Sequence, residues 1–381
     1  MRLQQISIRH GQFDHTRLAA LRALSPQLLL VFAALEFFEQ GSELAKLQQQ
    51  FPDTVLLGCS TAGEIDAHGV GEHTAVLTAL QFAHSQVRAA STPLAGMADS
   101  HTAGIRLGQQ LAADDLQLVL LLGQGVAING SALLRGLGNV LGEHLPVVGG
   151  LAADNAAFRQ TWTLDRQGCS SQSVSAVGIY GHGLHIGHGS YGGWTTFGPA
   201  RKVTRCHENI LYELDGIPAL EVYKRYLGEY ADQLPGSGLL FPFSMLGLQQ
   251  QEAGVIRTIL AVDETSGSMT LAGEIEPESY LKLMHATTDH LVRGAEMAAQ
   301  AARQETENGE TLAILVSCVG RKLVMGDLVD EEVEAVQDIL GKNTLLAGFY
   351  SNGEISPFAT GMPCRLHNQT MTITTVTEHE S

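Results

Sequence analysis

Cysteine and positive charge are both scarce in this sequence. Its five cysteines never occur as a C-x-x-C pair, so neither a disulfide framework nor a structural zinc site is expected. The 40 Asp and Glu residues outnumber the 23 Lys and Arg residues and give a formal net charge of −17. Nucleic acids and anionic membrane surfaces are bound through clustered Lys and Arg, so the sequence predicts neither as a partner.

Long apolar runs are missing as well. No stretch approaches the ~18 uncharged apolar residues of a membrane-spanning helix, and the first residues lack the apolar core of a signal peptide. We therefore expect a cytoplasmic protein. The 381 residues are 44% hydrophobic and 17% charged, which is typical of a folded chain with two or three domains.

What the chain does contain is a ten-residue phrase that occurs twice, at residues 56–65 and 346–355. Each copy follows a short apolar run and contains Gly-Glu-Ile, which predicts a strand that runs into a glycine turn. Open sheets place ligands at strand ends of this kind. The candidate ligand-pocket residues are therefore side chains of the two copies: Ser60, Thr61, Glu64, Tyr350, Ser351 and Glu354.

Glu64 and Glu354 have a functional and a structural interpretation. Each carboxylate either receives the donor groups of a ligand or accepts hydrogen bonds from backbone N–H groups in its own tight turn. The sequence does not decide between the two. A glycosidase also uses a pair of carboxylates, but nothing else in the chain supports sugar hydrolysis, and we do not expect an enzyme.

The same order of elements surrounds both copies of the phrase. A strand, a helix and a second strand precede the turn over residues 28–57 and again over residues 312–346. A looser third instance lies at residues 117–155, where Gly149 takes the place of Gly58. Repetition of one supersecondary unit indicates a duplicated architecture.

Between these units the sequence predicts antiparallel strands and two further helices, at residues 219–230 and 277–303. We therefore predict an α+β fold of two related domains, each a mixed sheet packed with helices. The predicted domains are residues 1–215 and 216–381, since a boundary is plausible in the loop-rich region that follows residue 200.

Several of these stretches resemble a known family. Residues 58–65 are similar to the signature of the FIST N-terminal domain, and residues 348–358 and 366–370 are similar to the FIST C-terminal domain. Residues 193–199 and 214–219 resemble the segment that joins them. FIST domains are regarded as intracellular sensory modules that bind ligands, so the resemblance implies a signal sensor.

A stand-alone FIST chain of this size is most similar to the nitric-oxide-sensing haem proteins of the NosP group. That resemblance implies a b-type haem, reversible binding of nitric oxide and control of a partner histidine kinase. The alternative is a FIST sensor that binds an amino acid or another small metabolite without haem. A hydrolase ranks below both, and a homo-oligomer is compatible with the sequence.

A haem sensor needs an axial ligand, usually a neutral histidine in an apolar pocket. His188 is the leading candidate for this metal ligand, because it stands just before an aromatic segment, and His182 and His285 are the other candidates. The structural alternative is that His182 and His188 are exposed hairpin residues. The aromatic walls predicted for the haem are Tyr191, Trp194 and Phe197. Arg321 is predicted to clamp a ligand carboxylate or a haem propionate, with an exposed surface arginine as the alternative.

Overall fold

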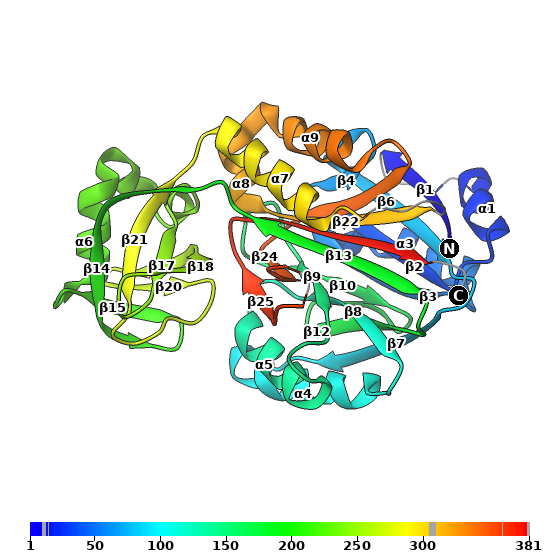
Figure 1. Cartoon of the computed structure of the whole chain (residues 1–381), viewed down its shortest axis with the longest axis horizontal. Helices are drawn as coiled ribbons and strands as arrows, with labels where there is room; N and C mark the ends of the chain where they lie inside the picture. The colour runs from blue at the N-terminus through cyan, green and yellow to red at the C-terminus, as the bar shows by residue number, and fades with distance from the viewer. Residues whose placement is uncertain (10–12, 14, 305–309, 360, 379–381) are drawn as a thin grey trace.

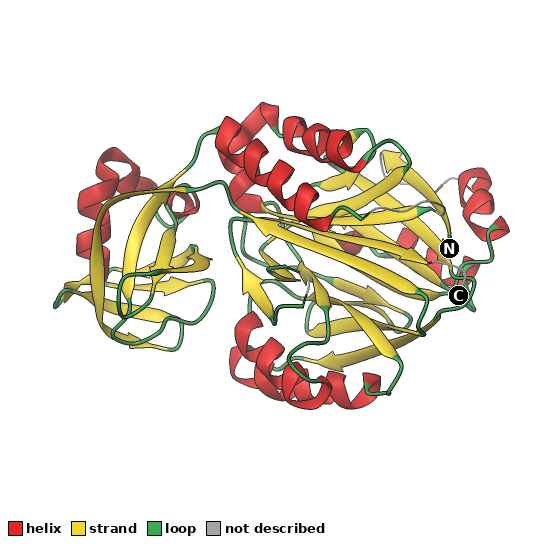
Figure 2. Cartoon of the chain, viewed as in Figure 1, coloured by secondary structure: helices red, strands yellow, loops and turns green. Residues whose placement is uncertain are grey.

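The computed structural model describes the whole chain except residues 10–12, 14, 305–309, 360 and 379–381. The described residues form three six-stranded sheets and one eight-stranded sheet, with helices packed against them (Figures 1 and 2). The predicted α+β class is confirmed. No helix in the described part of the chain is long and apolar enough to cross a membrane.

Three units with the same order of elements build the larger body, which we call the core. The first unit contains β1 (Arg2–Arg9), α1 (His15–Ala23), β2 (Leu28–Ala34), α2 (Leu35–Gln40), α3 (Ser42–Gln50), β3 (Val55–Thr61), β4 (Glu64–Asp66), β5 (Gly69–Gly71) and β6 (Thr74–Gln81). The second contains β7 (Gln86–Pro93), α4 (Ser100–Leu111), β8 (Leu116–Gly123), α5 (Gly130–Leu141), β9 (Val147–Leu151), β10 (Thr163–Asp165), β11 (Gly168–Ser170) and β12 (Ser173–Tyr180). The third contains β13 (Leu184–Tyr191), α7 (Thr288–Ala302), β22 (Thr311–Cys318), α8 (Val319–Met325), α9 (Asp330–Leu340), β23 (Thr344–Ser351), β24 (Gly353–Pro357), β25 (Cys364–His367) and β26 (Met371–Glu378).

The short hairpin of each unit, β4-β5, β10-β11 or β24-β25, pairs with the sheet of a neighbouring unit. The sheet orders are β1-β6-β2-β3-β10-β11, β7-β12-β8-β9-β24-β25 and β13-β26-β22-β23-β4-β5. In every sheet the second and third strands of the unit are parallel, and the foreign hairpin pairs antiparallel with the third strand. The sequence repeat therefore describes three units that complete one another in a ring.

A glycine stands at the same place in the third strand of each unit, at Gly58, Gly149 and Gly348. A Cβ at these positions would lie only 2.4, 2.1 and 2.0 Å from a backbone carbonyl oxygen of the adjacent parallel strand. Only a residue without a side chain permits this close approach of two strands. Gly149, in the looser third copy of the repeat, therefore occupies the same structural position as Gly58 and Gly348.

The three sheets enclose a shared apolar interior. Phe32 on β2 and Phe349 on β23 meet there with ring centroids 4.7 Å apart, and Leu120 on β8 belongs to the same buried cluster. The opposite faces of the sheets are covered by the helices, each with a separate buried cluster. The core therefore has one interior common to all units and three outer layers.

A fourth sheet lies outside the core and is inserted into the third unit between β13 and α7 (left in Figure 1). We call residues 195–285 the inserted module. Its elements are β14 (Thr195–His207), β15 (Ile210–Leu214), β16 (Ile217–Pro218), α6 (Ala219–Leu227), β17 (Phe243–Leu246), β18 (Glu252–Arg257), β19 (Ile259–Asp263), β20 (Ser268–Leu271) and β21 (Tyr280–His285).

The inserted module changes how the predicted domain boundary is understood. Residues 215 and 216 lie in the turn between β15 and β16, inside this sheet, where Leu214 pairs with Ile217. The third unit begins before the module and resumes after it, because β13 pairs with β26. Division at this turn therefore separates strands that share one sheet.

The predicted helix over residues 277–303 is wrong in its first half. Residues 280–285 form β21, in which Leu281, Leu283 and Met284 are buried and Lys282 is half-buried. The helix α7 begins only at Thr288, because the Thr287 side chain accepts a hydrogen bond from the backbone N–H of His290 and caps it. Apolar residues in this short stretch satisfied both a helical and a strand spacing.

We predict that Gly348→Ala lowers the free energy of unfolding by about 3 kcal/mol or more, because the new Cβ collides with the Leu315 carbonyl oxygen. Urea denaturation measures the change. Gly236→Ala is the control, since no atom lies within 4 Å of its added Cβ, and it should be close to neutral. Equal stability of the two variants would contradict the close-approach argument.

Candidate functional site

The two glutamates of the repeated phrase are buried in equivalent hydrogen-bond networks. Glu64 is 1% exposed and accepts hydrogen bonds from the Thr61 hydroxyl and from both the backbone N–H and the hydroxyl of Thr74. Glu354 is 0% exposed and accepts the same set from Ser351 and Thr370, at 2.9–3.1 Å. Each carboxyl group therefore ties its own hairpin to the strand that follows it.

The second unit shows that this position does not require a carboxylate. Thr163 occupies the register that Glu64 and Glu354 hold in their sheets, and its hydroxyl lies 2.7 Å from that of Ser173. Asp154, which replaces a glycine in the sequence repeat, instead accepts hydrogen bonds from three backbone N–H groups of its longer turn. The geometry at all three positions is that of a structural clamp.

Burial has a direct electrostatic effect on the two glutamates. Loss of hydration raises the pKa of Glu64 to about 7 and the pKa of Glu354 to about 8, although the hydroxyl and N–H donors oppose the shift. Both groups are therefore protonated in the folded state at pH values where the unfolded chain is ionised.

The remaining residues of the predicted pocket are also used inside the protein. Ser60 donates to the Ala153 carbonyl at 2.8 Å and accepts from the Trp162 N–H at 3.0 Å. The Tyr350 hydroxyl donates to the buried carboxylate of Glu332. The structure thus brings the predicted pocket residues together where the three turns meet, and none of them lines the cavity of about 700 Å³ described below.

Arg321, the predicted propionate clamp, is fully buried. Its guanidinium forms an ion pair with Glu332 and donates to the carbonyl oxygens of Gly192 and Leu291. The alternative of an exposed surface arginine is wrong, and the guanidinium is engaged by partners within the protein. Gly192 stands where the chain enters the inserted module and Leu291 lies in α7, so Arg321 fastens the entering segment to the core beside this helix.

His188 has the character of a metal ligand but not the expected surroundings. It is 2% exposed on β13, and burial lowers its pKa to about 4, so the imidazole is neutral. Nδ1 lies 3.2 Å from the Thr374 hydroxyl, whereas Nε2 has no hydrogen-bond partner. A neutral imidazole with an unpartnered nitrogen suits haem iron in its chemistry.

The aromatic residues do not gather around His188. Tyr191 is three residues further along β13 and therefore lies on the opposite face of the sheet, where its ring contacts Phe358. Trp194 donates its indole N–H to the Gln369 carbonyl at 2.8 Å. Phe197 belongs to the inserted module, with its ring 5.6 Å from His285. The described side chains thus do not assemble a haem pocket at His188.

The other candidate histidines are separated from His188. His182 precedes β13 and is exposed, and His285 ends β21 in the inserted module. Among the described residues, no group of three or more His, Cys, Asp or Glu is arranged to hold a metal ion.

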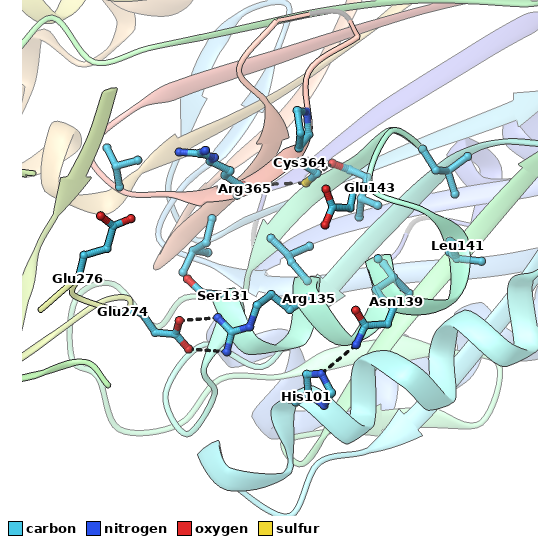
Figure 3. Close-up of a pocket in the computed structure, with 18 of the residues that line it drawn as sticks. His101, Ser131, Arg135, Asn139, Leu141, Glu143, Glu274, Glu276, Cys364 and Arg365 are labelled. Atoms are coloured by element: carbon cyan, nitrogen blue, oxygen red, sulfur yellow. Dashed lines mark hydrogen bonds and ion pairs between the residues drawn. The ribbon is translucent and has the colours of Figure 1, made fainter. Parts of the chain in front are cut away.

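A cavity of about 700 Å³ lies between the core and the inserted module (Figure 3). Its walls come from α5, from β25 and from the module at β18 and residues 274–277. Most of the apolar lining belongs to leucine, valine, isoleucine and methionine side chains. A volume of 300–1,000 Å³ with apolar walls and a few polar groups is usual for a small-molecule site.

Charged groups converge on this cavity from both bodies. Arg135 on α5 makes two hydrogen bonds to the Glu274 carboxylate of the inserted module, which links the two walls. Figure 3 shows this pair beside Glu143, Glu276 and Arg365. Arg257, at the end of β18, is buried in the wall.

Sequence reasoning missed this cavity because its walls come from three distant segments. No short motif joins α5, β18 and β25. One signal was present in Val255-Ile256-Arg257-Thr258-Ile259, where a charged residue interrupts an apolar run that predicts a buried strand.

Comparison with known families gives a consistent result. The FIST N domain model matches residues 27–217, and the FIST C domain model matches residues 219–357. The chain belongs to the FIST family. FIST domains are signal-sensing domains, so this FIST protein has a sensory role.

No curated protein matches the sequence of this FIST protein. Among solved structures, it is similar to a crystal structure of cyanuic acid hydrolase from A. caulinodans, with 10% identity, 99% of each chain covered and a TM-score of 0.40. At this level the likeness supports no functional argument, and the site is interpreted from the side chains themselves.

We predict that Glu354→Gln flattens the pH dependence of stability. In the wild type, protonated Glu354 stabilises the fold at low pH, and this contribution is lost as the pH rises from about 5 through about 8. The variant should match the wild type near pH 5 and exceed it at pH 8 by roughly a few kcal/mol, measured by urea denaturation. Glu334→Gln, on the exposed face of α9, is the control, and parallel pH profiles for wild type and Glu354→Gln would refute the prediction.

Proposed function

We propose that this FIST protein senses an amino acid or another small metabolite that binds in the cavity between the core and the inserted module. The observation that carries the proposal is the cavity itself, with its volume of about 700 Å³, its apolar walls and its charged groups. The protein would act in the cytoplasm without catalysing a reaction, and its output would reach a partner such as a histidine kinase.

The position of the cavity supplies a route from binding to output. Only two chain segments, around residues 192–194 and 286–287, join the module to the core. A ligand that contacts both walls favours one relative position of the two bodies over others, which is the principle of hinge closure around a ligand. The Arg135–Glu274 pair already bridges the cavity and would move with this change.

Haem-based sensing of nitric oxide is the second candidate function. The observation in its favour is His188, whose buried Nε2 has no partner among the described residues. A haem at this position would be held by the imidazole and would supply the iron that binds nitric oxide. The placement of Tyr191 and Phe197 argues for the metabolite, because neither side chain lies on the His188 face of β13.

We predict that metabolites which raise the melting temperature of the wild type fail to do so in Leu134→Trp. The larger side chain occupies the cavity, which Leu134 lines on α5. Thermal shift measurements and small-angle scattering, with a change in radius of gyration on binding, test the proposal. Leu323→Trp, at a leucine 47% exposed on α8, is the matched control. A ligand response that survives in Leu134→Trp contradicts the cavity as the site.

We also predict that protein reconstituted with haem shows no stoichiometric Soret band that shifts with nitric oxide. Absorption spectroscopy decides this, with His188→Ala compared with His185→Ala, an exposed histidine on the same strand. A nitric-oxide-sensitive band that disappears only in His188→Ala would establish the haem function in place of the metabolite.

A further inference from the structure

Arg257 is a buried cation without an acidic partner. It is 7% exposed, and its Nε donates to the Glu274 carbonyl at 3.2 Å. Nη1 donates to the Ile256 and Leu366 carbonyl oxygens at 3.2 and 3.4 Å. No carboxylate among the described residues forms an ion pair with Arg257, and its Nη2 has no hydrogen-bond partner among them. A buried charge of this kind is costly to the folded protein unless something compensates it.

The neighbouring acids do not supply the missing partner. The Glu274 carboxylate is engaged by both terminal nitrogens of Arg135 and by the Asn129 side chain. Glu274 and Glu276 both lie close enough to influence Arg257 electrostatically, but neither makes an ion pair with it. Burial lowers the pKa of Arg257 to about 10, so the guanidinium is still charged at neutral pH.

The chain also leaves room for this guanidinium. A Cβ on Gly273 would lie 2.7 Å from Arg257 Cζ and 3.1 Å from Nη2, so any larger residue would displace the charged group. Arg257 lines the cavity beside Val255, Ile275 and Leu366, and thus joins a positive group to an apolar surface. The guanidinium fork matches a carboxylate in geometry.

We propose that Arg257 binds the carboxylate of an organic acid whose apolar part fills the rest of the cavity. The inference rests on the proposed sensory function and names the class of its ligand. The cavity is lined by Glu143, Glu274 and Glu276 and by Arg135, Arg257 and Arg365, so its acidic and basic side chains balance, and a singly charged carboxylate fits better than a phosphate dianion. The ligand is therefore a monocarboxylate with an apolar body.

The first experiment uses the wild-type chain, so it does not depend on the folding of a variant. Calorimetry compares 3-phenylpropionate and 4-methylpentanoate with their primary amides and with inorganic phosphate. Each carboxylate should bind at least about tenfold more tightly than its amide, because a hydrogen bond to a charged group is the stronger one. Equal binding of acid and amide, preference for phosphate, or no binding of either acid overturns the inference.

The second experiment assigns the effect to Arg257. Arg257→Gln should lose about tenfold to a hundredfold in affinity for the carboxylates and little for the amides. Arg205→Gln removes an exposed arginine of the same module, paired with Glu213, and should bind like the wild type. Unchanged carboxylate affinity in a folded Arg257→Gln variant contradicts the assignment.

A third variant separates this inference from the proposed function. Suppose that the wild type binds acids and amides with equal affinity and that Leu134→Trp binds neither. The cavity is then the ligand site, and the carboxylate inference fails. If Leu134→Trp blocks neither, the proposed function fails as well. Selective loss of carboxylate binding in Arg257→Gln, with loss of all binding in Leu134→Trp, supports both.

Discussion

The pairing of each short hairpin with the third strand of another unit is the constraint on which the structure depends. β4 pairs with β23, β10 with β3 and β24 with β9, so no unit completes its own sheet. This exchange places the three turns next to one another, while glycine is required where the two parallel strands within each unit approach closely. The buried carboxyl groups of Glu64 and Glu354 then hold two of the hairpins against the strands that follow them.

The ring of units also bears on where the proposed ligand site lies. Its interior is filled by apolar side chains, and the side chains of its turns are engaged by hydrogen bonds within the protein. The cavity of about 700 Å³ lies where the inserted module meets the core. Arg321, held by Glu332, fastens the segment at Gly192 that enters the inserted module to the third unit. The cavity lies farther along the same interface, against α5 and β25, where the contact between the bodies is incomplete.

Much of the fold was predictable, because its supersecondary unit repeats in the sequence. The candidate site was not predictable, because its walls come from segments that are distant in the sequence and meet only in the folded protein. The Gly-Glu-Ile phrase identified two units, and Gly149 indicated a third. In that unit a longer turn precedes Thr163, so the sequence did not show that Thr163 is equivalent to Glu64. The inserted module was not recognised, since residues 280–285 have a spacing compatible with a helix. Arg257 is conspicuous in the sequence only as a charge within an apolar run, and its unpaired state follows from tertiary contacts.

The most direct test of the cavity as the sensory site is hydrogen exchange with and without a metabolite that stabilises the protein. Our account predicts slower exchange in α5, at residues 255–257 and 273–276, and in β25, which form the walls of the cavity. The turns at residues 61–64 and 351–354 and the strand β13 should exchange at an unchanged rate. Protection confined to β13 and residues 192–197 would contradict the account and place the ligand at His188.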